Sequence, residues 1–151
     1  MNKITRWVYQ TVDGVQNVIK WLPVIWGDRD WEDYYFYKIL HFKLKNMEEF
    51  FRSDDTHIAD AIKVADKIKV ARILAERLKE ERYLANAMLF FDKKYDSDKI
   101  MKIENGFVKW SDDKKMMKAW HWCCKHSDYM EEEDRRYFFD YLNKWLPWWW
   151  D

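Results

Sequence analysis

Two histidines and two cysteines fall within six residues, in the run His121-Trp122-Cys123-Cys124-Lys125-His126. Such a density of ligating side chains is typical of zinc sites, where four ligands converge on one ion. On a helix, however, His121 and Cys124 share one face, while Cys123 and His126 share a nearly opposite face. Because each face offers at most two ligands, the spacing predicts buried thiols beside ordinary histidines, and no metal site.

A polar pair interrupts the apolar side of this same predicted helix. His126 and Asp134 fall among the apolar positions of one stripe, which are Cys123, Met130, Tyr137, Phe138, Tyr141 and Trp145. An unpaired buried carboxylate costs several kcal/mol, so Asp134 must meet a cation or another donor, or open onto a polar cavity. Two interpretations stay open, a structural ion pair or hydrogen-bond network and a ligand-facing pair. In the second, the candidate ligand-binding residues are His126 and Asp134 with Trp120, Trp122 and Tyr129 around them.

Aromatic side chains are unusually frequent, with 11 Trp and 9 Tyr in the chain. Aromatic faces beside Arg or Lys hold nucleobases and other flat ligands, and they also form hot spots of protein interfaces. The sequence contains no P-loop, dinucleotide-binding, esterase or HExxH motif. The motifs therefore identify neither an enzyme class nor a cofactor, and an enzyme that lacks these motifs is one alternative.

Charge and composition exclude several classes of protein. Lys and Arg together number 27, as do Asp and Glu, so no net positive charge favours general DNA binding. No apolar stretch approaches the roughly 18 residues that span a bilayer, which argues against a membrane protein. Adjacent cysteines on a helix are poorly placed for a disulfide, so we expect a cytoplasmic protein. At this length, residues 1–151 fit a single domain.

Only three Gly and two Pro occur, which favours long helices over many short strands. Amphipathic spacing predicts helices over about 4–22 and 31–51, and one long helix or a helical pair over 58–91. Residues 114–146 are predicted to be helical as well, either as one helix or as two with a break near Ser127-Asp128. Clusters of Asp, Ser and Thr at 28–30, 53–56 and 111–113 are the expected N-caps. The fold class is therefore mainly α, a compact domain of four to six helices.

Three further expectations concern packing. Asn105-Gly106 between two alternating segments predicts one small β-hairpin. It should lie against the helices or cover another part of the molecule, because two strands alone are marginally stable. The first helix should bury its apolar face in the core, and the alternative is a surface for a membrane or a partner. The terminal aromatic cluster around Trp148 and Trp149 should be packed down.

Two segments resemble a family of small uncharacterised proteins of tailed bacteriophages. One is the C-terminal pattern from Lys125 to Met130, continued by Asp134, Phe138, Leu142 and the ending Trp149-Trp150-Asp151. The other runs from Trp26 to Tyr35 and continues through Phe42-Lys43-Leu44 and Met47-Glu48. Together they cover about a third of the chain, and Glu133 stands where the family's pattern has Gln.

The resemblance implies a non-enzymatic binding protein that needs no cofactor and is expressed inside an infected bacterium, with a role in host takeover or against host defence. The partner would then be a host protein or a small nucleotide-like ligand that the protein sequesters. The alternative is a protein–protein interaction module or a structural component of the virion. The oligomeric state is not determined by the sequence, and a homo-oligomer is possible.

Overall fold

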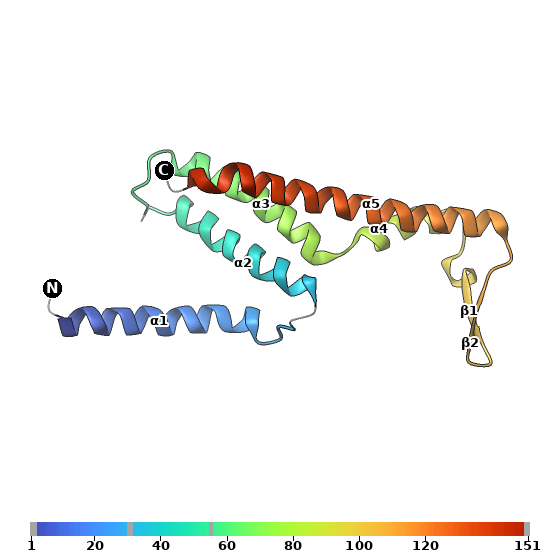
Figure 1. The fold of residues 1–151 in the computed structure, drawn as a ribbon, viewed down its shortest axis with the longest axis horizontal. Coiled ribbons are helices and arrows are strands. Elements are labelled where there is room, and N and C mark those ends of the chain that lie inside the picture. Colours follow the sequence, from blue (N-terminus) through green and yellow to red (C-terminus); the bar gives the residue numbers. More distant parts are fainter. Residues whose placement is uncertain (1–2, 30–31, 55, 150–151) are drawn as a thin grey trace.

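The computed structural model describes residues 3–29, 32–54 and 56–149, with side chains described from residue 6 onward. These ranges contain five α-helices and one two-stranded antiparallel sheet, so the predicted mainly α class is confirmed (Figure 1). The helices are α1 (Lys3–Ile25), α2 (Asp33–Arg52), α3 (Ala61–Glu80), α4 (Tyr83–Asp92) and α5 (Lys114–Trp145). Two short 3-10 turns, η1 (Ser97–Lys99) and η2 (Leu146–Trp149), and the strands β1 (Met101–Glu104) and β2 (Phe107–Trp110) complete the fold.

The larger core lies between α2, α3 and the C-terminal half of α5. Ala65, Ala71 and Ala75 on α3 are buried, and their small side chains let the aromatic helix α2 approach closely. Phe138 of α5 is fully buried in the same cluster, and so is Trp149 of η2. The expectation that the terminal aromatic segment packs down is therefore confirmed for Trp149, while Trp148 is exposed and residues 150–151 lie outside the described ranges.

A second, smaller core lies at the other end of α5. Phe91 of α4, Ile100 after η1, and Met116 and Cys123 of α5 are buried together. The helix α5 runs unbroken past Ser127-Asp128 and joins both cores, which settles the alternative that the sequence left open. Its N-cap is Asp113, as predicted, since the Asp113 carboxylate accepts hydrogen bonds from the backbone N–H groups of the next turn.

The segment 58–91 forms a helical pair, α3 and α4, joined by a tight elbow. At the elbow Glu81 adopts a left-handed conformation with φ 48°, which ends α3 without glycine. The elbow turns Tyr83 back toward α5 and leaves Arg82 paired with Glu80, and it thereby shapes the site described below. Two helices begin later than the predicted cap clusters: α2 follows Glu32, α3 follows Asp60, and Ser53 ends α2. Asp30 and Asp55 of these clusters lie outside the described residues.

The apolar face of α1 is exposed, so the prediction of a core-packing first helix is wrong. Only the C-terminal end of α1 contacts the other helices, through buried Val24 and through Trp21, whose ring meets Phe42 of α2 edge-on at 4.8 Å. Figure 1 shows the rest of α1 apart from the bundle. No helix in the described ranges is long and apolar enough to cross a bilayer.

The β-hairpin forms at Asn105-Gly106, where both residues have positive φ, as the turn prediction requires. Both strands are exposed throughout, so the expectation that the hairpin lies against the helices is wrong. Its base is held instead, because Ile100 is buried and the Ser111 N–H donates to the Ile100 carbonyl at 2.8 Å. The hairpin consequently projects from the end of the bundle (Figure 1).

Candidate functional site

Asp134 is the one carboxylate among the described residues that is buried, with 3% of its surface exposed. The Tyr83 hydroxyl donates to Asp134 Oδ2 at 2.8 Å, and Arg77 Nη2 lies 2.9 Å from the same oxygen. These contacts join α3, α4 and α5 at one point. The sequence requirement that Asp134 meet a cation or another donor is therefore met by a guanidinium and a phenol.

Burial, the hydrogen bond to Asp134 and its charge raise the pKa of Tyr83 far above the ordinary value, so this phenol stays protonated and donates. Arg77, in contrast, is half exposed. Its guanidinium carries five N–H donors, of which the ion pair occupies only part. Tyr83 thus holds Asp134, and Asp134 pairs with a guanidinium that is still half exposed and keeps donors for other groups.

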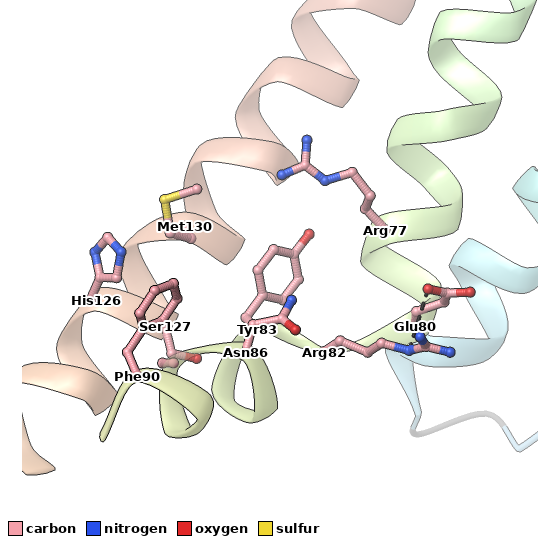
Figure 2. Close-up of a pocket in the computed structure, with 10 residues that line it drawn as sticks. Arg77, Glu80, Arg82, Tyr83, Asn86, Phe90, His126, Ser127 and Met130 are labelled. Carbon is pink, nitrogen blue, oxygen red and sulfur yellow. Dashed lines mark ion pairs between the residues drawn. The ribbon is translucent and has the colours of Figure 1, made fainter. Parts of the chain in front are cut away.

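Those donors border a groove of about 400 Å³ between the end of α3, α4 and the middle of α5 (Figure 2). The groove residues supply cations, aromatic faces, an amide and an imidazole; they are Arg77, Glu80, Arg82, Tyr83, Asn86, Ala87, Phe90, His126, Ser127 and Met130. Figure 2 shows the ends of Tyr83 and Arg77 pointing toward each other, with Arg82 paired to Glu80 beside them. Both guanidinium groups are paired, Arg82 with Glu80 and Arg77 with Asp134, so the charges around this groove balance.

A second hollow, of about 650 Å³, lies on the other side of Arg77 along α5. Asp134 borders this hollow together with Glu133 and Asp140, against the cations Arg77 and Lys144. Three carboxylates against two cations make it unfavourable for an anion. The first groove is therefore the better candidate for a negatively charged ligand.

The structure separates the five residues predicted to bind a ligand. His126 borders the groove and stacks on Trp122, with ring centroids 4.9 Å apart. Trp122 itself is exposed and borders a smaller apolar hollow of about 320 Å³. Trp120 meets Phe91 edge-on in the smaller core, and Tyr129 lies on the surface near Glu133.

No hydrogen bond or ion pair of the described residues joins His126 to Asp134. They are eight positions apart on one helix, which separates them by about 12 Å along its axis. Asp134 lies behind Arg77 and does not border the first groove. Of the two interpretations that the sequence left open, the geometry supports the structural network for Asp134, while a ligand contact through His126 stays a prediction.

Sequence reasoning missed Arg77, Arg82, Tyr83 and Phe90. The buried carboxylate signals that a cation must lie near, but nothing in the spacing selects Arg77 from the other basic residues. Arg82 and Tyr83 follow an elbow at a glutamate, where no glycine marks the turn. Only the folded arrangement of α3, α4 and α5 brings these residues together.

The described residues contain no group of three or more His, Cys, Asp or Glu side chains that would hold a metal ion. Cys123 is buried and its thiol contacts the Ala87 carbonyl at 3.7 Å, and burial raises the pKa of this thiol. Searches for similar proteins returned no match to any family model, curated protein or solved structure. The resemblance to phage proteins thus stays a prediction, and the residues of the groove are the evidence for a function.

Proposed function

We propose that this chain is a non-enzymatic binding protein whose groove between α3, α4 and α5 holds a small, nucleotide-like anion. The observation that carries the proposal is the guanidinium of Arg77 at the groove wall, which pairs with Asp134. Because that pairing already restricts the side chain, Arg77 loses less conformational freedom when a ligand binds, which favours affinity. Guanidinium groups match phosphate oxygens in both charge and geometry.

The other groove residues suit the flat part of such a ligand. Phe90 is exposed on α4, and His126 is already stacked on an indole, so both rings offer faces to a base. The Asn86 side chain lies between them and Arg82 along the groove and can donate to and accept from a base edge. This combination of cation, ring and amide supports a phosphorylated aromatic ligand over an apolar one.

Binding without turnover is proposed because the groove lacks an assembled nucleophile. Ser127 borders it, but no hydrogen bond of the described residues links its hydroxyl to His126 or to another base. With the resemblance to phage proteins, a sequestering role inside an infected bacterium follows, in which the ligand is a signal or metabolite of the host.

Native mass spectrometry of the protein, purified gently from expressing cells, tests this proposal. The wild-type chain should carry an added small mass that denaturation releases, and Arg82→Gln and His126→Ala should lose it while their far-UV spectra stay unchanged. Arg136→Gln is the matched control, because Arg136 lies on the exposed side of α5 away from the groove. A bare wild-type chain, or equal loss in the control, contradicts the proposal.

A second candidate function, a protein-interaction module, is favoured by one separate observation. The apolar face of α1 has no cover within the described chain, although helices of this kind are normally buried on that face. This surface and the groove lie on different elements, so the two functions do not exclude each other.

A further inference from the structure

Along most of its length α1 shows its apolar side to solvent. Val18 is 63% exposed, Ile19 66% and Trp7 67%, whereas buried contacts are confined to the last turn, at Val24. A 23-residue helix is about 34 Å long, so this exposed face extends well beyond the single attachment at Trp21 and Phe42.

The apolar positions on this face alternate in steps of three and four residues. Val8, Val15 and Leu22 form one row, and Thr11, Val18 and Ile25 form the other, so that successive positions are 8, 11, 15, 18, 22 and 25. Each row repeats every seven residues, which is the heptad spacing of a coiled-coil seam. In this register the rows are the a and d positions.

The one polar residue in the seam is already satisfied within the helix. The Thr11 hydroxyl donates to the Trp7 carbonyl at 2.9 Å, which leaves the Thr11 methyl group for packing. Trp7, Val12 and Ile19 flank the rows and widen the apolar surface. The seam therefore brings no unpaired polar group to an interface.

Charge on α1 is confined to the opposite side. Arg6, Asp13 and Lys20 repeat at intervals of seven residues and occupy the f position, farthest from the seam. The remaining outer positions are largely neutral, with Gln10, Gln16 and Asn17. A helix that binds an anionic membrane surface carries several Lys or Arg residues on its polar face, whereas residues 6–25 of α1 carry two, with Asp13 between them.

We infer that α1 is the interface through which two copies of this chain associate as a two-stranded coiled coil. Eight large apolar side chains of each copy lie on this face, in the seam and beside it. A symmetric pair brings together twice as many. At about 60 to 120 Å² per fully buried aliphatic side chain, with about half of that area still exposed, the pair covers roughly 500 to 1,000 Å², the size of a small interface. A second copy supplies the same seam at the same spacing, as two-fold symmetry requires.

Light scattering coupled to size exclusion, with sedimentation equilibrium, tests this inference on the full chain. The wild type should have twice the chain mass, and Val15→Lys/Val18→Lys should be a monomer over the whole measured concentration range. The matched control is Gln16→Lys/Asn17→Lys, which adds the same charge at neighbouring positions outside the seam and should remain a dimer. Because the seam positions lie outside both cores, the two cores of the seam variant should fold as they do in the wild type.

Three results would overturn the inference. The first is a monomeric wild type, whether it is free or bound to vesicles of anionic phospholipid. The second is a dimer that persists in the seam variant, because the contact would then lie elsewhere, for example on the exposed hairpin. The third is equal dissociation of the seam and control variants, because charge alone would then explain the loss.

Discussion

The network around Asp134 predicts an unequal cost for removing its two charged partners. Asp134 is buried, while half of the Arg77 side chain is in contact with water. In Arg77→Met the buried carboxylate keeps only the Tyr83 hydroxyl as a donor. In Asp134→Asn the arginine can turn to solvent, and the amide oxygen still accepts from Tyr83.

Removing one member of a fully buried pair costs about 3 to 5 kcal/mol. Because solvent screens the half-exposed Arg77, we reduce this and expect a loss of about 2 kcal/mol of unfolding free energy for Arg77→Met. Asp134→Asn and Tyr83→Phe each weaken or remove one hydrogen bond and should cost about 1 kcal/mol. The control Arg82→Met breaks an exposed pair with Glu80 and should change stability by less than about 0.5 kcal/mol.

Urea unfolding at neutral pH, followed by far-UV circular dichroism with a shared m-value, measures all four variants. The reasoning is refuted if Asp134→Asn costs as much as Arg77→Met, because the carboxylate would then not depend on the cation. It is equally refuted if Arg82→Met matches Arg77→Met, because burial of the pair would then be irrelevant.

Three further predictions concern stability. Burial lowers the pKa of His41 from its ordinary 6.5, so the unfolded chain takes up the proton first and stability should fall as the pH drops below about 7. His41→Gln should reduce this pH dependence of the urea midpoint between pH 7 and 5. An unchanged pH dependence would contradict the assignment. Asp113→Ala should lower stability by about 1 kcal/mol, because α5 loses its N-cap. In the same thermal unfolding experiment the control Asp112→Ala should be near neutral. Equal losses in the two variants would show that Asp113 does not stabilise α5 as its cap. Phe138→Ala should cost about 3 to 5 kcal/mol, because the ring is fully buried. Phe139→Ala should cost less, since Phe139 is 43% exposed, and denaturant midpoints in the reverse order would refute the core assignment.

Local features were predictable from the sequence wherever the physical cause is local. The hairpin turn needs two residues that tolerate positive φ, and Asn105-Gly106 supplies both. The start of α5 needs a side-chain acceptor, and Asp113 is one. Local signals did not decide whether residues 114–146 form one helix or two. The structure has one helix, α5, and the two cores pack against it on either side of Ser127.

Features that depend on a partner were not predictable. Amphipathic spacing shows that α1 has an apolar face, but it does not say whether the same chain covers that face. The hairpin was expected to be covered for the same reason, and only its base at Ile100 is. For the site, the sequence indicated that Asp134 needs a cation, whereas the choice of Arg77 depends on the elbow at Glu81 that aligns α3 and α4.

We propose that the groove beside Arg77 binds a small phosphorylated aromatic molecule. Isothermal titration calorimetry of the wild-type protein with AMP, ADP and ATP, and with adenosine as the uncharged control, tests it most directly. We predict saturable binding of at least one nucleotide, weakened by salt and by Arg82→Gln, with adenosine binding less tightly than any nucleotide that binds. Absence of saturable heat with every nucleotide, or binding of adenosine as tight as that of the nucleotides, would contradict the account.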